Sequence, residues 1–182
     1  LVASASIDGL TNPIKGPAIR TDFQGNFYVT FLYEISPEVF APYFLRMNTG
    51  GTVAVPSKKL VDSSHNYAKV SFDINDDFEL AVAFEDLTDK KIEYQRFDET
   101  GTALTGRVTI SQDTKYGLLT LTGNSRNPVV NVGENNSLFI SFEQDKGGAL
   151  YGIAFYSPVL EDRFDSLAVM KDFDSASENF ES

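Results

Sequence analysis

The residue types that could do chemistry in this sequence gather in two short polar segments. In the first, the single histidine, His65, follows Asp62, Ser63 and Ser64, which together are the residue types of a hydrolytic triad. A triad needs its base within about 3 Å of the nucleophile and held there by the acid. Neighbours in one short loop seldom meet that requirement, so we interpret this segment as a polar turn and predict no catalytic residue.

In the second segment, Asp73, Asn75 and Asp77 occupy alternate positions. Alternate residues of a tight loop can turn three oxygens inward, as the hard cation Ca²⁺ requires. The sequence therefore offers a possible calcium site at these residues. The other interpretation is a hairpin turn whose Asp and Asn side chains satisfy backbone groups. The turn is favoured because no glycine follows at the sixth position and because the corresponding loop, residues 22–26 (DFQGN), has a single carboxylate.

Composition excludes most other site classes. The chain has no cysteine, which removes disulfides, thiolate zinc sites, iron–sulfur clusters and a cysteine nucleophile, and one histidine cannot build an imidazole-rich metal site. We therefore expect no cofactor, with calcium as the one possible exception. A net charge of −11, from 15 basic and 26 acidic residues, argues against nucleic acid as a partner, and no apolar run approaches the roughly 20 residues needed to enter a membrane.

The elements that must position these residues are short alternating strands that recur along the chain. Three matching segments each follow a polar turn: NFYVTFLYE (26–34), DFELAVAFED (77–86) and SLFISFEQD (137–145). Their alignment superimposes three phenylalanines, Phe31, Phe84 and Phe142, which we expect to be buried at equivalent positions. Period-2 alternation of this kind is typical of a half-buried strand.

Further strands flank each matching segment. A leading strand is expected at 18–23, 67–74 and 128–132, a following strand at 42–48, 92–98 and 150–156, and a last strand at 52–61, 103–111 and 166–170. Arg46 and Arg96 fall at the same place in the first two units, which indicates a repeated structural role such as pairing with a nearby acidic side chain. In the third unit the same spacing puts Ala154 at that place.

Four antiparallel strands per unit predict an all-β, β-propeller-like fold, and the alternative is a β-sandwich. The predicted domain spans 1–170, with repeats at about 19–70, 71–126 and 127–170, and an acidic tail follows at 171–182. Propellers typically have about four to eight blades, so three would leave open faces. We therefore expect a protein partner, either a second copy of this chain or neighbouring repeats of a longer one.

Residues 72–111 resemble the repeat of large secreted bacterial surface proteins, whose pattern is F-D-x-x-G-N-F-V-V-A-W followed by Y-x-Q-R-F-D-x-x-G-T. Here Asp77 stands in place of the Asn and Asp76 in place of the Gly. The resemblance implies a propeller-like or related β fold in an extracellular, periplasmic or cell-surface protein. It carries no enzymatic activity with it.

The predicted function is accordingly a non-catalytic binding or assembly module. A lectin-like, glycan-binding module is the first alternative, because tyrosines accompany the strands: Tyr28, Tyr33, Tyr43, Tyr94, Tyr151 and Tyr156. The absence of Trp weakens that alternative. A propeller-type hydrolase is the third possibility, but it would need convergent acid, base or metal residues that the sequence does not offer.

Overall fold

The computed structural model describes residues 9–62, 64–111, 124–133, 137–147 and 150–157, and over these residues every long regular element is a β-strand. The strands are β1 (Ile14–Thr21), β2 (Phe27–Ser36), β3 (Val39–Met47), β4 (Val53–Lys59), β5 (Tyr67–Ile74), β6 (Leu80–Asp86), β7 (Lys91–Phe97), β8 (Val108–Thr109), β9 (Ser125–Val132), β10 (Leu138–Gly147) and β11 (Leu150–Tyr156). The prediction of an all-β protein is confirmed.

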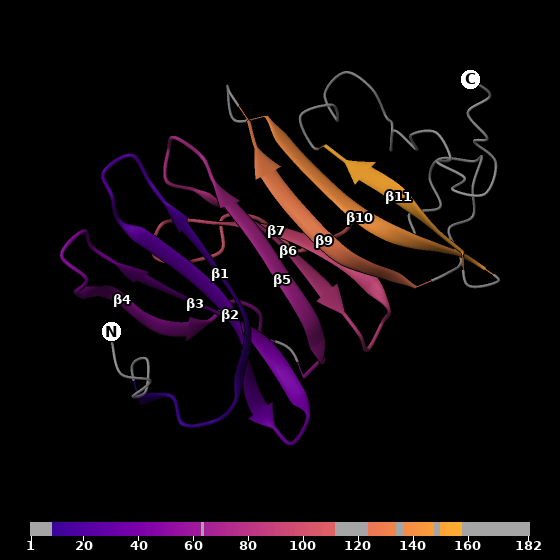
Figure 1. The fold of residues 1–182 in the computed structure, drawn as a ribbon, viewed down its shortest axis with the longest axis horizontal. Helices are drawn as coiled ribbons and strands as arrows, with labels where there is room; N and C mark the ends of the chain where they lie inside the picture. Colours follow the sequence, from indigo (N-terminus) through magenta and orange to yellow (C-terminus); the bar gives the residue numbers. More distant parts are fainter. Residues whose placement is uncertain (1–8, 63, 112–123, 134–136, 148–149, 158–182) are drawn as a thin grey trace, which may run out of the picture.

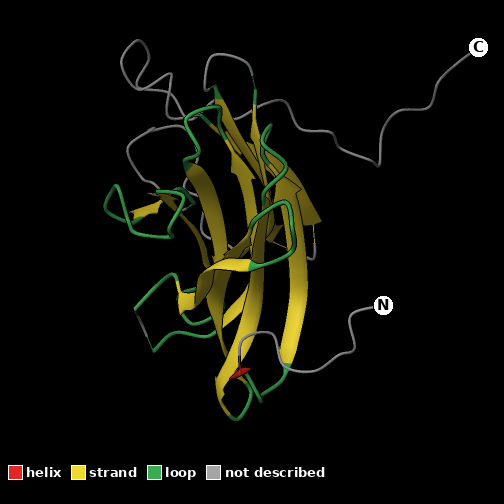
Figure 2. Cartoon of the chain, turned by 90° about the vertical axis from the view of Figure 1, so that its left-hand side faces the viewer, coloured by secondary structure: helices red, strands yellow, loops and turns green. Residues whose placement is uncertain are grey.

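These strands form three antiparallel sheets in which neighbours along the chain pair with each other. Sheet 1 contains β1 to β4, sheet 2 contains β5 to β8, and sheet 3 contains β9 to β11. The three sheets stack in chain order, with sheet 2 between the other two (Figure 1). Turned on its side, the stack shows long strands with turns and loops at their ends (Figure 2). The strand expected at 166–170 and the tail at 171–182 lie outside the described residues.

Four hairpin loops share one design that the sequence encodes locally. Each opens with an Asp or Asn whose Oδ1 accepts two backbone N–H groups, from the residues two and four positions later, at 2.8–3.1 Å: Asp22, Asn48, Asn75 and Asp98. The fourth position of each loop has a positive φ, which favours glycine. Glycine occupies it at Gly25, Gly51 and Gly101, and Phe78 takes the same conformation at φ 62°.

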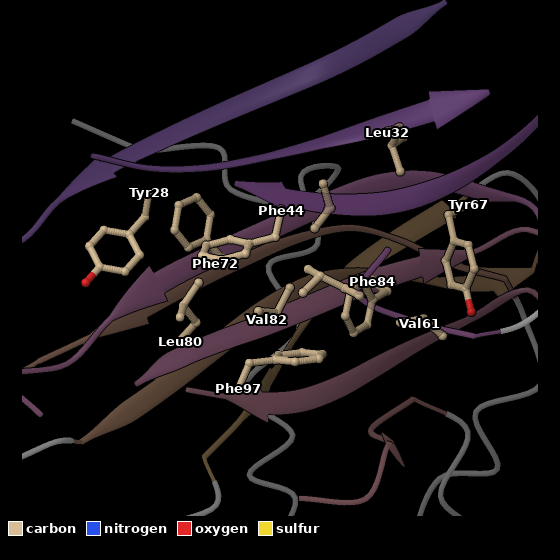
Figure 3. Packing of buried hydrophobic residues seen from close by; sticks show 12 residues of the cluster. Tyr28, Leu32, Phe44, Val61, Tyr67, Phe72, Leu80, Val82, Phe84 and Phe97 are labelled. Carbon is tan, nitrogen blue, oxygen red and sulfur yellow. The ribbon is translucent and has the colours of Figure 1, made fainter. Parts of the chain in front are cut away.

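Sheet 2 is packed on both faces. Every residue of β6 is buried, and its side chains alternate between two apolar clusters. Leu80, Val82 and Phe84 point into the cluster shared with sheet 1 (Figure 3), whereas the smaller Ala81 and Ala83 point into the cluster shared with sheet 3. The unbroken burial of β6 is therefore a consequence of its place in the middle of the stack.

The three aligned phenylalanines are buried, as predicted. Phe31, Phe84 and Phe142 have relative exposures of 0%, 0% and 2%, and each is the fifth residue of the second strand in its sheet. Phe84 packs toward sheet 1 and Phe142 toward sheet 2, so both face the preceding sheet. Phe31 lies on the corresponding face of sheet 1, where its ring stacks on Tyr43 at 5.9 Å.

The position of Phe84 leads to a stability prediction. Replacing Phe84 with Ala should lower the free energy of unfolding by about 3–5 kcal/mol, because it leaves a cavity between two sheets. The matched control is Leu87→Ala at an exposed turn residue, 46% accessible, which should change stability by no more than about 0.5 kcal/mol. Urea unfolding followed by circular dichroism measures both, and equal losses in the two variants would contradict the assignment of Phe84 to the core.

Candidate functional site

His65 lies in the linker between β4 and β5, and its partner is a carboxylate from a distant strand. Its Nδ1 is 2.6 Å from Oδ2 of Asp86, the last residue of β6. Asp86 is fully buried, and its Oδ1 accepts the N–H groups of Thr88 and Asp89. The pair therefore fixes the linker onto sheet 2.

Contacts of the neighbouring residue Asn66 also hold the linker against the sheets. Asn66 accepts the N–H of Phe40 in sheet 1 at 2.9 Å, and its own N–H donates to Thr88 beside sheet 2. Asp62, the carboxylate closest to His65 in sequence, has a fully exposed side chain near Lys59, and Ser63 lies outside the described residues. The sequence did not single out Asp86, because it follows His65 by 21 residues and only the path of β6 brings it near.

Together with Asp89, His65 and Asp86 form a group of side chains of the types that bind metal ions. Nδ1 of His65 and carboxylate oxygens of Asp86 and Asp89 lie within 4.8 Å of one another. Asp89 already has a cationic partner, because Lys91 Nζ is 2.8 Å from Asp89, and the same Nζ is 3.2 Å from Glu93. The hydrogen bond from Lys91 lowers the pKa of Asp89. Partial burial works against the charge of Lys91, but the hydrogen bonds to Asp89 and Glu93 outweigh it and raise the pKa of Lys91. These contacts describe an ion-pair network.

The three predicted calcium ligands are divided between a strand and a loop. Asp73 lies within β5, where Oδ1 accepts a hydrogen bond from Arg20 of sheet 1 and Oδ2 accepts the N–H of Val132 of sheet 3. Asn75 opens the following hairpin loop, and its Oδ1 accepts two backbone N–H groups. Asp77 lies in that loop. The hydrogen bonds favour the turn interpretation at Asn75 and assign Asp73 to the contacts between sheets.

Arg46 and Arg96 both form ion pairs, as their repeated position suggested. Arg46 contacts Glu99 at 2.6 Å, and Arg96 contacts Glu79. The two arginines are also equivalent in the structure. Arg46 pairs with Tyr28 and Arg96 pairs with Ala81, and each of these partners is the second residue of the second strand in its sheet.

The expected alignment of Ala154 with these arginines is wrong. Ala154 pairs with Phe142, whereas Phe84 pairs with Glu93 rather than with Arg96. The hairpin between β6 and β7 is three residues shorter than its counterpart between β10 and β11, so equal spacing along the sequence does not give equal register.

The tyrosines are divided between the core and one open face. Tyr28 and Tyr94 are buried and belong to the two apolar clusters. Tyr33 and Tyr43 are partly exposed on the outer face of sheet 1, where their rings meet edge to face at 5.1 Å. Tyr156 packs against Tyr94 beside the cluster between sheets 2 and 3, and the side chain of Tyr151 is not among those described. Among the described tyrosine side chains, Tyr33 and Tyr43 present aromatic surface in the way that a glycan-binding face would.

The candidate functional site is the outer face of sheet 3, which we call the distal face and define by Val129, Phe139, Ile153 and Phe155. The first three are 51%, 51% and 56% exposed, and Phe155 is half-buried. Strand register brings them together, because Val129 and Phe155 lie opposite the same residue of β10, Ser141. Contiguous exposed apolar patches mark interaction surfaces, whereas apolar side chains exposed singly are common on any protein.

No protein-family model matches this chain, and no curated protein shows significant similarity to it. Within the part of the chain that the structure describes, no helix is long and apolar enough to cross a bilayer.

The hairpin loops predict a pH dependence of stability. Partial burial opposes ionisation of Asp98, but hydrogen bonds from Thr100 and Thr102 outweigh it and lower its pKa. Because the folded pKa lies below the unfolded value of about 3.9, the stabilisation is present above that value and is lost as the pH falls through the folded pKa. Asp98→Asn keeps the acceptor and removes the charge, so its unfolding free energy should fall less than that of the parent on acidification.

Urea titrations between about pH 6 and pH 2 test this expectation, since that interval spans both the folded and the unfolded titration of an aspartate. Asp62→Asn, at an exposed carboxylate, is the control and should follow the parent. If Asp98→Asn instead follows the parent at every pH, the loop carboxylate is not the source of the acid sensitivity.

The geometry also predicts the outcome of a calcium titration. Binding at Asp73, Asn75 and Asp77 would have to displace hydrogen bonds that join Asp73 to two other sheets and Asn75 to its own loop. We therefore expect no saturable heat in calorimetry up to about 1 mM calcium, the range of weak extracellular sites. A saturable heat in the parent that disappears in Asp77→Ala would contradict this expectation and establish the calcium site.

Proposed function

We propose that this chain is a non-catalytic binding and assembly module whose sheets stack in a propeller-like array. Support comes from the repeated architecture: three antiparallel sheets follow one another with the same strand order, and one backbone hydrogen bond closes the first hairpin of each, from Asp22 to Asn26, from Asn75 to Glu79 and from Gly133 to Ser137. A β-sandwich would bury one face of each of two sheets, whereas sheet 2 here is buried on both. The stack thus resembles consecutive blades more closely than a sandwich.

The observation that carries the proposal is the exposed distal face of sheet 3. In sheets 1 and 2 the corresponding face is covered by the next sheet, and its apolar side chains are buried. In sheet 3, Val129, Phe139 and Ile153 stay about half exposed. Covering such side chains with a partner removes apolar surface from water, at roughly 25 cal/mol per Å², so the face favours association with another protein surface.

The polar groups of the chain support a structural rather than a catalytic role. Arg46 and Arg96, which a sialidase-like propeller enzyme would need to direct at substrate, are held by Glu99 and Glu79. His65 and Asp86 fasten a linker. The resemblance of residues 72–111 to the repeats of secreted bacterial surface proteins adds an extracellular, periplasmic or cell-surface location to the proposal.

A lectin-like function is the second candidate, and the exposed pair Tyr33 and Tyr43 on the outer face of sheet 1 is the observation that favours it. Partly exposed aromatic rings side by side can stack on the apolar face of a sugar. The absence of Trp from the whole sequence leaves this face with less aromatic surface than a Trp-bearing platform would have.

Two measurements separate the candidates. At a dilution where the chain is monomeric, the parent should bind the apolar dye bis-ANS, and Phe139→Ser should lower the dye signal several-fold, whereas Leu87→Ser, at a similarly exposed turn residue, should not. A glycan array probed with the labelled protein should remain blank. Glycan binding that is lost in Tyr43→Ala would favour the lectin instead, and a monomeric parent that binds no dye would contradict the proposed binding face.

A further inference from the structure

Strand register aligns the three sheets residue by residue. The first hairpin of each sheet joins an equivalent pair of residues: Thr21 with Phe27, Ile74 with Leu80, and Val132 with Leu138. Counting back two residues from the end of the leading strand gives Ile19, Phe72 and Val130. Counting forward one residue from the start of the second strand gives Tyr28, Ala81 and Phe139. Each triplet occupies one position in the repeated architecture.

The first triplet identifies an uncovered position on sheet 1. The leading strands β5 and β9 lie across the preceding sheet, and there Phe72 and Val130 have exposures of 0% and 1%. Ile19, their counterpart in β1, is 54% exposed, because no described sheet precedes sheet 1. The outer face of sheet 1 thus carries the apolar side chain that its equivalents insert into a neighbour.

The second triplet identifies the matching uncovered position on sheet 3. Tyr28 and Ala81 are 0% and 7% exposed because the next sheet covers them, whereas Phe139 is 51% exposed. The following strand shows the same difference. Ile153 pairs with Glu143, and its equivalent Ile92 pairs with Glu85, yet Ile153 is 56% exposed and Ile92 is fully buried.

The polar contacts between sheets extend the same pattern. The N–H of Val132 donates to Asp73 of the preceding sheet. The residue equivalent to Val132 in β1 is Thr21, and the residue equivalent to Asp73 in sheet 3 is Asn131, which is exposed and offers an amide oxygen. Sheets 1 and 3 therefore present the two complementary halves of a contact between sheets. The chain makes the apolar part of this contact twice and the polar part once, between sheets 2 and 3. Sheets 1 and 3 lie at opposite ends of the stack (Figure 1).

We propose that the partner of the distal face is a second copy of this chain, joined head to tail. The outer face of sheet 1 in one copy, centred on Ile19, covers the distal face of sheet 3 in the other, centred on Phe139. This inference rests on the proposed assembly function and names its partner. Two such contacts close two copies into a ring of six sheets, which lies within the range of about four to eight blades seen in propellers.

Two variants, each with one of the two contacting faces altered, test the head-to-tail arrangement. Ile19→Lys removes one half of the contact, and Phe139→Lys removes the other; both sites are exposed, so neither change disturbs the core. Light scattering after size exclusion should give about 40 kDa for the parent (2 × 20.1 kDa) and about 20 kDa for each variant alone. An equimolar mixture of the two variants should recover a 40 kDa species, because one contact then has two unaltered halves. Leu87→Lys, on neither face, should keep the parent mass.

Other outcomes overturn the inference. If Ile19→Lys keeps the dimer while Phe139→Lys is monomeric and mixing restores nothing, two distal faces pair with each other. A parent that stays at 20 kDa shows that a second copy is not the partner. Dye binding by that monomer to the distal face would leave the proposed binding function standing, whereas absence of both dye binding and dimer would remove the function as well.

Discussion

The structure depends on one constraint, which is that sheet 2 must be buried on both faces. All seven residues of β6 are buried, and they divide by size, with Leu, Val and Phe toward sheet 1 and Ala toward sheet 3. A strand with two buried faces cannot stand alone, so both neighbouring sheets are needed to cover it. The two contacts of sheet 2 are therefore packed by different side chains. Toward sheet 1, sheet 2 supplies the large side chains; toward sheet 3, sheet 2 supplies small ones, and Phe142 of sheet 3 packs against them.

Polar contacts fix how the sheets lie on one another. The edge strand β9 would expose N–H groups to solvent or to another strand, which is a hazard for aggregation. Side chains of sheet 2 accept these groups instead: Ser71 from Val130, Asp73 from Val132, and Glu85 from Asn127. Asp73 also accepts a hydrogen bond from Arg20, so a single carboxylate joins all three sheets. Much of the acidic character that first suggested metal chemistry therefore serves the contacts between sheets and the hairpin loops.

Because these acidic side chains are engaged in structural contacts, the uncovered faces of sheets 1 and 3 are the surfaces on which we place the function. Among the described sheets, sheet 2 alone has a neighbouring sheet on each of its two faces, and sheets 1 and 3 have a neighbour on one face. The uncovered faces keep exposed apolar side chains among their polar ones; on sheet 3, Phe139 and Ile153 lie beside Asn131 and Glu143. Phe139, Ile153 and Ile19 occupy positions at which the other sheets bury apolar or aromatic residues. The proposed assembly follows because a second copy would bury these side chains as the neighbouring sheets bury their equivalents.

The sequence by itself determined the features that depend on neighbours along the chain. Period-2 alternation predicted the strands, β5 and β11 to the residue, and placed Phe31, Phe84 and Phe142 correctly in the core, because alternation reports directly which side of a strand is buried. The Asx loops were also readable, since the side chain and the N–H groups that it accepts lie within five residues. The alignment of Ala154 failed because hairpin length, which sets register, varies between units.

Only the tertiary structure decided which distant groups meet. Asp86 is the partner of His65, and Asp73, a candidate calcium ligand in the sequence, bridges two other sheets. Both contacts form because the stacking order brings β6 to the linker and β9 across β5. The distal face likewise has no signature in the sequence. Phe139 alternates as Tyr28 and Ala81 do, and it is exposed because no described sheet lies over sheet 3. Burial across a sheet face is a property of the stack, whereas alternation within a strand is a property of the chain.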